Sequence, residues 1–199
     1  ARWLPERPAL ALGPTPVRSY RQMAARVSQL SSGLSGRLGL KRGDRVALAM
    51  KNCPEFYEVL FACWHAGMTA VPMNAKLHPR EFAYILENSG ARVCFVSREL
   101  AASIPSGVPV DESLLLHEGA PAETRPEDPA WLFYTSGTTG VPKGAVLTHR
   151  NMLFQTQAYF ADIDRLAPTD AALHPAPLSH GSGLYGLPHF AAGAVNVIP

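Results

Sequence analysis

A segment rich in glycine and hydroxyl residues, TSGTTGVPKG from Thr135 to Gly144, follows directly after the apolar run AWLFY. Glycines allow positive φ angles, so that successive backbone N–H groups can point into one concavity that suits an anion. The hydroxyls add neutral donors, and Lys143 adds a full positive charge. No acidic residue occurs between Asp128 and Asp162 to repel a bound anion. These residue types predict a loop that binds phosphate.

The spacing within this segment excludes the loop of P-loop NTPases. That loop requires G-x-x-x-x-G-K-S/T, and counting from Gly137 places Pro142 where the second glycine should be. A glycine-rich loop without any ligand is the alternative, and composition alone would favour it. The complete string, however, resembles the phosphate-binding signature of the adenylate-forming superfamily, which contains acyl-CoA synthetases, nonribosomal peptide adenylation domains and firefly-type luciferases. Every position of that signature is met from Thr135 to Gly144.

A second motif, PLSHGSGL from Pro177 to Leu184, resembles the next signature of the same family. In the family its histidine lies beside the acyl pocket and the path of the thiol acceptor, so the resemblance assigns His180 to substrate binding. A histidine that only holds the loop is the structural alternative. Ser179 stands where many relatives carry an aromatic ring, and the role of that ring is therefore not transferred.

The resemblance implies roles for the residues of the glycine-rich loop. Those expected to bind the phosphates of ATP are Thr135, Ser136, Gly137, Thr138, Thr139, Gly140 and Lys143. Lys143 would also be catalytic, because it would stabilise the charge that grows on the departing pyrophosphate. Thr135 would approach the magnesium ion. Mg²⁺ usually needs at least one carboxylate beside the phosphates, and this stretch contains none.

The function that the resemblance implies is ATP-dependent activation of a carboxylic acid to an acyl-adenylate, followed by transfer of the acyl group to coenzyme A. Two alternatives stay open: an amino-acid adenylation domain that loads a carrier protein, and a non-catalytic binding domain of the same fold. The family's adenine pocket, hinge and C-terminal catalytic lysine find no counterpart in residues 1–199. We therefore expect an N-terminal fragment of an acyl-CoA synthetase, inactive by itself, and the sequence does not indicate which acid is activated.

The elements that must position these motifs begin with alternating helices and short apolar runs. Ser19 and Gln22 form a capping box, and the apolar stripe of a helix with one buried face follows at Met23, Val27, Leu30, Leu34 and Leu38. Strands are expected at 45–50, 69–73 and 92–96, with helices from Pro54 and Pro79 between them. This alternation predicts an α/β fold with a mostly parallel sheet and helices on both faces. By resemblance it is the N-terminal part of the large domain of an adenylate-forming enzyme.

The second half of the chain is divided from the first by a proline-rich, acidic stretch. We expect residues 1–117 to form an N-terminal α/β subdomain, residues 118–129 an exposed connector, and residues 130–199 the phosphate-loop segment of the same large domain. A helix is expected at 151–163. The apolar run 194–198 is expected to be a strand that nothing later in the chain covers.

Composition limits the partners of the protein. Its 18 basic and 16 acidic residues give a formal charge of +2, which does not indicate a nucleic-acid partner, and no apolar run is long enough to span a membrane. Three cysteines fit neither a disulfide framework nor a metal site, so we expect a cytoplasmic protein with buried thiols. We assign no role to His65, His78, His117, His174 or His189, and expect His149 and Arg150 to be solvated or capping. The sequence sets no oligomeric state.

Overall fold

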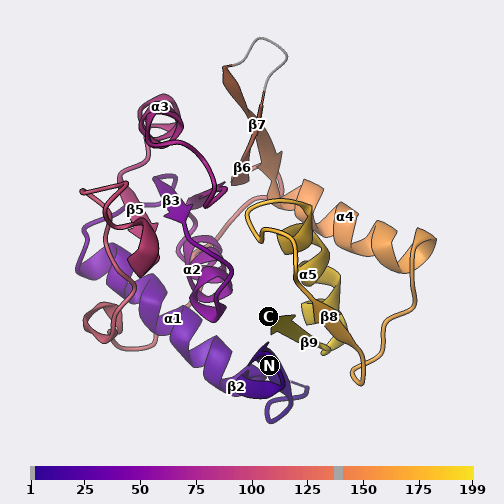
Figure 1. Cartoon of the computed structure of the whole chain (residues 1–199). Helices are drawn as coiled ribbons and strands as arrows, with labels where there is room; N and C mark the ends of the chain where they lie inside the picture. Colours follow the sequence, from indigo (N-terminus) through magenta and orange to yellow (C-terminus); the bar gives the residue numbers. More distant parts are fainter. Residues whose placement is uncertain (1–2, 137–140) are drawn as a thin grey trace.

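Two sheets run through the computed structural model, which describes residues 3–136 and 141–199 (Figure 1). The larger sheet has the strand order β5-β3-β4-β6-β7. Its first four strands pair in parallel, and β7 runs antiparallel to β6. The bounds are β3 Arg45–Ala49, β4 Thr69–Met73, β5 Val93–Val96, β6 Pro129–Ser136 and β7 Pro142–Thr148.

The smaller sheet has the order β2-β1-β9-β8 and joins the two ends of the chain. Its strands are β1 Pro8–Leu12, β2 Thr15–Ser19, β8 Ala171–Leu173 and β9 Val195–Ile198. The sequence predicted β9, with nothing later in the chain to cover it. The two strands that pair with it both precede it: β1 lies parallel on one edge and β8 on the other.

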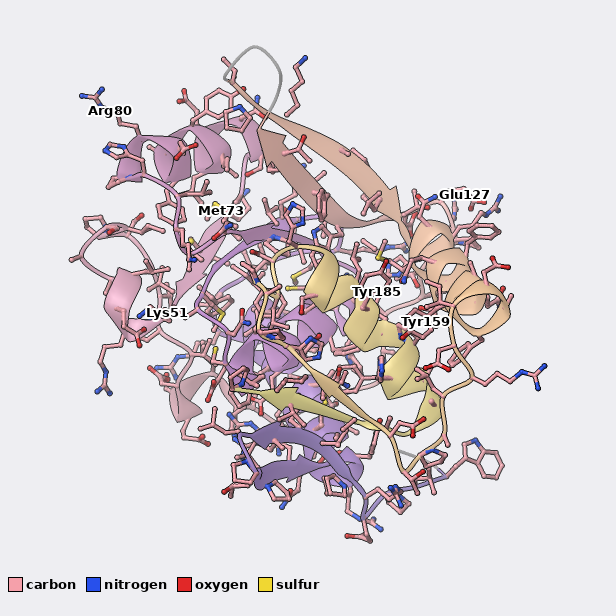
Figure 2. The ribbon with its side chains drawn as sticks, turned by 45° about the vertical axis from the view of Figure 1, so that its right-hand side comes forward. Lys51, Met73, Arg80, Glu127, Tyr159 and Tyr185 are labelled. Atoms are coloured by element: carbon pink, nitrogen blue, oxygen red, sulfur yellow. The ribbon has the colours of Figure 1, made fainter. Side chains whose placement is uncertain are left out.

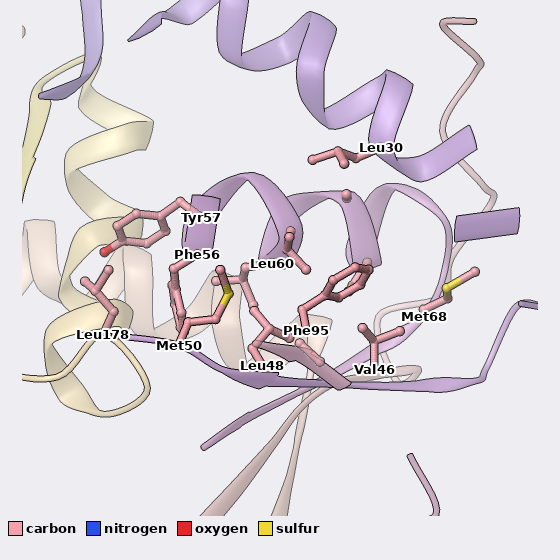
Figure 3. Close-up of a cluster of buried hydrophobic side chains, with 14 of the residues drawn as sticks. Leu30, Val46, Leu48, Met50, Phe56, Tyr57, Leu60, Met68, Phe95 and Leu178 are labelled. Atoms are coloured by element: carbon pink, nitrogen blue, oxygen red, sulfur yellow. The ribbon is translucent and has the colours of Figure 1, made fainter. Parts of the chain in front are cut away.

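Helices cover both faces of the larger sheet. On one face, alternate residues such as Val46, Leu48 and Phe95 pack beneath α2 (Pro54–His65), over which α1 (Tyr20–Gly36) lies (Figure 3). The intervening residues, including Ala47 and Val71, pack against α3 (Pro79–Ser89) on the other face. All five residues of β4 are buried, as expected for a parallel strand covered on both sides. The predicted fold class is confirmed.

The helix boundaries follow from local capping chemistry. The Ser19 hydroxyl accepts from the Gln22 N–H, the Gln22 side chain accepts from the Ser19 N–H, and α1 begins there as predicted. Pro54 and Pro79 occupy the first turns of α2 and α3, where the missing N–H of proline removes no helical bond. The two later helices are α4 (His149–Asp162) and α5 (Gly181–Ala192), and short 3₁₀ turns occur at Arg98–Leu100 and Glu112–Leu114.

A buried ion network ties the two sheets together through the helices. The Glu58 side chain on α2 is fully buried and accepts from Arg18 Nε on β2 and from Arg26 Nε on α1, each at 2.8 Å. Arg26 also pairs with Glu112 at 3.1 Å. Because removing one partner of a buried pair leaves an uncompensated charge, this network makes the position of β2 against α2 costly to change.

The predicted connector, 118–129, is largely exposed and contains no helix or strand before β6 begins at Pro129. The segments on its two sides share both sheets, since β4 pairs with β6 and β1 pairs with β9. Among the described residues, no helix has the length and apolar character needed to cross a membrane.

The three cysteines are free thiols; Cys63 and Cys94 are buried, as expected, whereas Cys53 is not fully buried. Burial raises the pKa of Cys53 and of Cys94 to about 12 and that of Cys63 still further. Cys53 is only half-buried by exposed area, but its thiol is as protected from ionisation as that of Cys94. All three therefore remain protonated at neutral pH.

Candidate functional site

The glycine-rich loop joins the two strands of an antiparallel hairpin, β6–β7, whose far end projects from the rest of the ribbon (Figure 1). Thr135 lies opposite Lys143 in the hairpin register, and Tyr134 lies opposite Gly144. A Cβ atom on Gly144 would lie 2.9 Å from Tyr134 Cζ, so only glycine allows the tyrosine ring to cross this position undisturbed. The Tyr134 hydroxyl donates to Asn88 Oδ1 at 2.7 Å and thereby ties the hairpin to α3.

Residues directly opposite each other in an antiparallel pair point to the same face, and residues two apart on one strand share a face. Phe133, Thr135 and Lys143 therefore occupy one face of the hairpin. The His180 ring contacts the Phe133 ring on this face, with centroids 4.7 Å apart and planes at 62°. Phe133 could not be predicted as a site residue, because its contact with His180 joins elements that are far apart in the chain.

A cavity of about 430 Å³ opens where β4 and β6 end, and Thr135 and His180 both line it. Met73, the last residue of β4, lies at its wall (Figure 2), and Asn74 directly after it contributes a polar side chain. The carboxyl ends of parallel strands are the usual place for ligand sites in α/β sheets. A larger groove of about 840 Å³ lies against the opposite face of the hairpin, and within residues 3–136 and 141–199 none of the residues predicted to bind a ligand lines it.

His180 is the N-cap residue of α5, and its side chain is exposed. The two residues before it, Leu178 and Ser179, are buried, with exposed fractions of 1% and 8%. Because α5 begins directly after His180, the positive end of its dipole lies next to a residue of the cavity wall, where it favours a carboxylate or phosphate. His180 and Thr135 thus bring both sequence motifs to one cavity.

A buried histidine, His174, begins the loop that leads to His180. Its Nε2 lies 2.8 Å from Asn196 Oδ1 on β9, and its Nδ1 lies 2.9 Å from Ser182 Oγ in the first turn of α5. Because the amide oxygen can only accept, Nε2 carries the proton and Nδ1 accepts from the serine hydroxyl. Burial lowers the pKa of His174, so the ring is neutral. Sequence reasoning gave this residue no role, since nothing local marks it as buried.

The remaining loop residues divide into those the structure describes and those it does not. Lys143 is exposed on β7 and is not part of the cavity wall. The backbone of Ser136 pairs with Pro142, while its side chain is outside the description. Gly137, Thr138, Thr139 and Gly140 lie outside the described residues. Their assigned roles stay predictions.

The charged groups near the cavity include one that the motifs did not reveal. Glu81 on α3 lines the cavity, and its carboxylate accepts from the His78 N–H at 2.8 Å. Among residues 3–136 and 141–199, no group of three His, Cys, Asp or Glu side chains could hold a metal ion. The Thr135 hydroxyl fits a Mg²⁺ ion as a single oxygen ligand beside phosphate oxygens, but most of the coordination shell must come from other groups.

His149 and Arg150, which follow the loop in sequence and were not expected to bind a ligand, contact other residues of the protein. Thr148 caps α4 in a capping box with Asn151, and the His149 ring packs edge-on against Trp64 at 6.3 Å. Arg150 forms an ion pair with Glu127. Asn74 and Glu81 were missed, although the rule that ligands bind beyond parallel strand ends would have indicated Asn74 directly after the predicted strand TAVPM.

Comparison with known proteins gives the class to which this site belongs. The family profile described as AMP-binding enzyme matches residues 1–199, the whole chain. The chain belongs to this family of adenylate-forming enzymes.

Three relatives illustrate the range of the family. A feruloyl-CoA synthase from an Amycolatopsis species is 36% identical over 208 residues, a match that covers 100% of this chain and 42% of that protein. The nonribosomal peptide synthetase NPS2 of Ceriporiopsis subvermispora is 37% identical over 158 residues, covering 73% of this chain and 6% of that protein. The inhibitor-bound N-terminal domain of FACL13 from Mycobacterium tuberculosis superposes with a TM-score of 0.90 at 28% identity, covering 100% of this chain and 55% of that one. The chain thus spans less than half the length of the feruloyl-CoA synthase that it matches.

Proposed function

We propose that this chain is the N-terminal part of an acyl-CoA synthetase that activates a carboxylic acid with ATP and transfers the acyl group to coenzyme A. The observation that carries the proposal is the single cavity lined by Thr135 from the phosphate motif and His180 from the acyl motif. Membership of the AMP-binding family and the feruloyl-CoA synthase relative support the same reaction class. The free cysteines support a cytoplasmic location.

In the proposed first step, a carboxylate oxygen attacks the α-phosphorus of ATP while the bond from that phosphorus to pyrophosphate breaks. Lys143 and the loop from Thr135 to Gly140 bind the β- and γ-phosphates and stabilise the charge on the leaving pyrophosphate. The Thr135 hydroxyl is offered as one ligand of the Mg²⁺ ion, which when bound neutralises phosphate charge. Residues 1–199 alone are proposed to be inactive.

His180 is proposed to hold the acid. Its exposed ring lies at the cavity mouth over Phe133, and a neutral imidazole can donate one hydrogen bond to a carboxylate or adenylate oxygen. In the second step the thiolate of coenzyme A attacks the acyl carbon, the acyl–oxygen bond breaks, and AMP leaves. The N-terminal end of α5 favours the negative charge carried by both the acid and the adenylate.

A second candidate differs in the acid that is activated and in the acceptor. The likeness to a nonribosomal peptide synthetase supports an adenylation domain that loads an amino acid onto a carrier protein. His180 in its P-L-x-H-x-x-G context favours the coenzyme A enzymes by resemblance. The acceptor is therefore part of the test below.

The experiment is acid-dependent exchange of labelled pyrophosphate into ATP by the full-length protein, with aromatic, aliphatic and amino acids tried in turn. We expect exchange with at least one acid, and thioester formation when coenzyme A is added. Exchange that responds only to amino acids, without a coenzyme A thioester, would favour the carrier-loading alternative. No exchange with any acid would leave the non-catalytic binding domain as the better account.

A further inference from the structure

An asparagine far from both motifs in the sequence holds the loop that carries His180. Asn52 lies between the end of β3 and the start of α2, at the edge of the sheet where the cavity opens. Its side-chain amide donates to the carbonyl oxygens of His174 at 2.9 Å and of Ala176 at 2.8 Å. Its Oδ1 accepts from the Leu178 N–H at 2.9 Å. Three hydrogen bonds from one side chain thus fasten the segment His174–Leu178.

This segment has few other means of keeping its shape. It has the sequence HPAPL, and the two prolines cannot donate backbone hydrogen bonds. It contains no helix or strand. One end is anchored by the buried His174 ring and the other by Leu178, which is 1% exposed. Asn52 supplies the bonds between these two anchors, and His180 follows only two residues after the second.

The position of Asn52 connects the two halves of the site. β3 lies in the same sheet as β6, whose end leads into the phosphate loop, so Asn52 is fixed relative to Thr135 through the packed strands. Its bonds to 174–178 then set where α5 begins and where the His180 ring lies over Phe133. We infer that Asn52 is a positioning residue that fixes His180 at the cavity, and this inference rests on the proposed function of that histidine.

The test uses two variants of the full-length protein. Asn52→Asp keeps the size and the acceptor for Leu178 but removes both donors and places a negative oxygen near two carbonyls. Asn52→Ala removes all three bonds. Asn151→Ala is the control, because the Asn151 side chain also accepts hydrogen bonds, from the backbone N–H and the hydroxyl of Thr148, but at the start of α4.

In kinetics, we expect the Asn52 variants to raise KM for the acid or to slow thioester formation by roughly two- to tenfold, while KM for ATP changes much less. The effect should be non-additive: once His180 is replaced by alanine, adding Asn52→Asp should cause little further loss. Asn151→Ala should leave both KM values within twofold of the parent protein. Parallel damage to both substrates, additive with His180→Ala, would show that Asn52 serves general stability and would overturn the inference.

A spectroscopic measurement decides the same question without activity. In protein labelled with ¹³C-histidine, the resonance absent from His180→Gln identifies His180, and Phe133→Leu shows the ring-current shift that Phe133 imposes. We expect Asn52→Asp to move the His180 resonance towards its Phe133→Leu position, and Asn151→Ala to leave it unchanged. An unmoved resonance in both Asn52 variants would sink the inference. If His180→Ala proves kinetically silent, the proposed role of His180 fails, but the resonance still reports whether Asn52 positions it.

Discussion

The core of the larger sheet and the β6–β7 hairpin belong to one sheet but are stabilised in different ways. Every residue of β4 is buried, whereas the middle four residues of β7 are exposed. Burial on two faces fixes the parallel strands, while cross-strand register and the Tyr134–Asn88 hydrogen bond fix the hairpin. The comparison indicates that Thr135 and Lys143 stand at the far end of the hairpin, which contributes little to the core although Ala130 and Trp131 at its base are fully buried. Stability and activity should therefore respond to different substitutions.

The largest expected effect is in the core. Phe95 is fully buried against α2 (Figure 3), and Phe95→Ala should lower the free energy of unfolding by about 3–5 kcal/mol, through lost apolar burial and the cavity left behind. Val146→Ala on β7, where the side chain is 55% exposed, is the control and should cost less than about 0.5 kcal/mol. Denaturant unfolding of the two variants measures the difference. Equal losses would contradict the distinction between the two regions.

The second effect is on the hairpin and should spare stability. Lys143→Ala removes a charge-assisted phosphate contact worth about 1.5–3 kcal/mol, so pyrophosphate exchange should slow roughly ten- to a hundredfold. The denaturant midpoint of unfolding should equal that of the parent protein, because the Lys143 side chain is exposed. Lys41→Ala, which removes an exposed lysine just before the amino end of β3, should change neither property. Unchanged exchange in Lys143→Ala would refute the phosphate assignment.

Local chemistry explains which elements the sequence could predict. The capping box at Ser19 and the prolines that open α2 and α3 act within a few residues, and these helix starts are found where expected. Strands β1, β2 and β8 were missed. β1 and β2 contain Pro8 and Pro16, and proline counts against a strand, while β8 has only three residues and its partner β9 lies in a later part of the chain. The pairing of Thr135 with Lys143 could not be predicted either, because it spans a glycine-rich stretch that has no strand pattern of its own.

The site shows the same limit. A contiguous string identified Thr135, and a second string identified His180, so the sequence could predict both motifs. Their meeting at one cavity depends on the fold. The contacts of Asn52 and His174 could not be predicted, since each joins segments that are far apart in the chain. Neither residue belongs to a sequence motif that indicates a function.

The third prediction tests whether His180 belongs with the exposed hairpin or with the core. If its ring serves the acid, His180→Ala should cost about 0.5–1.5 kcal/mol in acid binding or thioester formation, while KM for ATP and the melting temperature change little. His117→Ala, at another exposed histidine, is the control. A large drop in melting temperature with parallel defects for both substrates would place His180 with the structural residues instead.

The smallest effect concerns His174, which lies between the two regions because it is buried yet begins the His180 loop. Burial lowers its pKa in the folded protein below the ordinary value of 6.5, so the unfolded chain binds the proton more readily. Stability from the neutral ring is therefore complete above about pH 6.5 and declines as the pH falls towards the folded pKa.

His65 and His149, whose pKa values burial also lowers, contribute with the same sign. We expect urea midpoints measured from pH 8 to pH 5 to fall less steeply in His174→Gln than in the parent protein. His65→Gln, at a histidine whose ring bonds Ser31 Oγ between α1 and α2, should remove a separate share of the slope. A slope identical in His174→Gln and the parent would show that the ring is not held neutral by the fold.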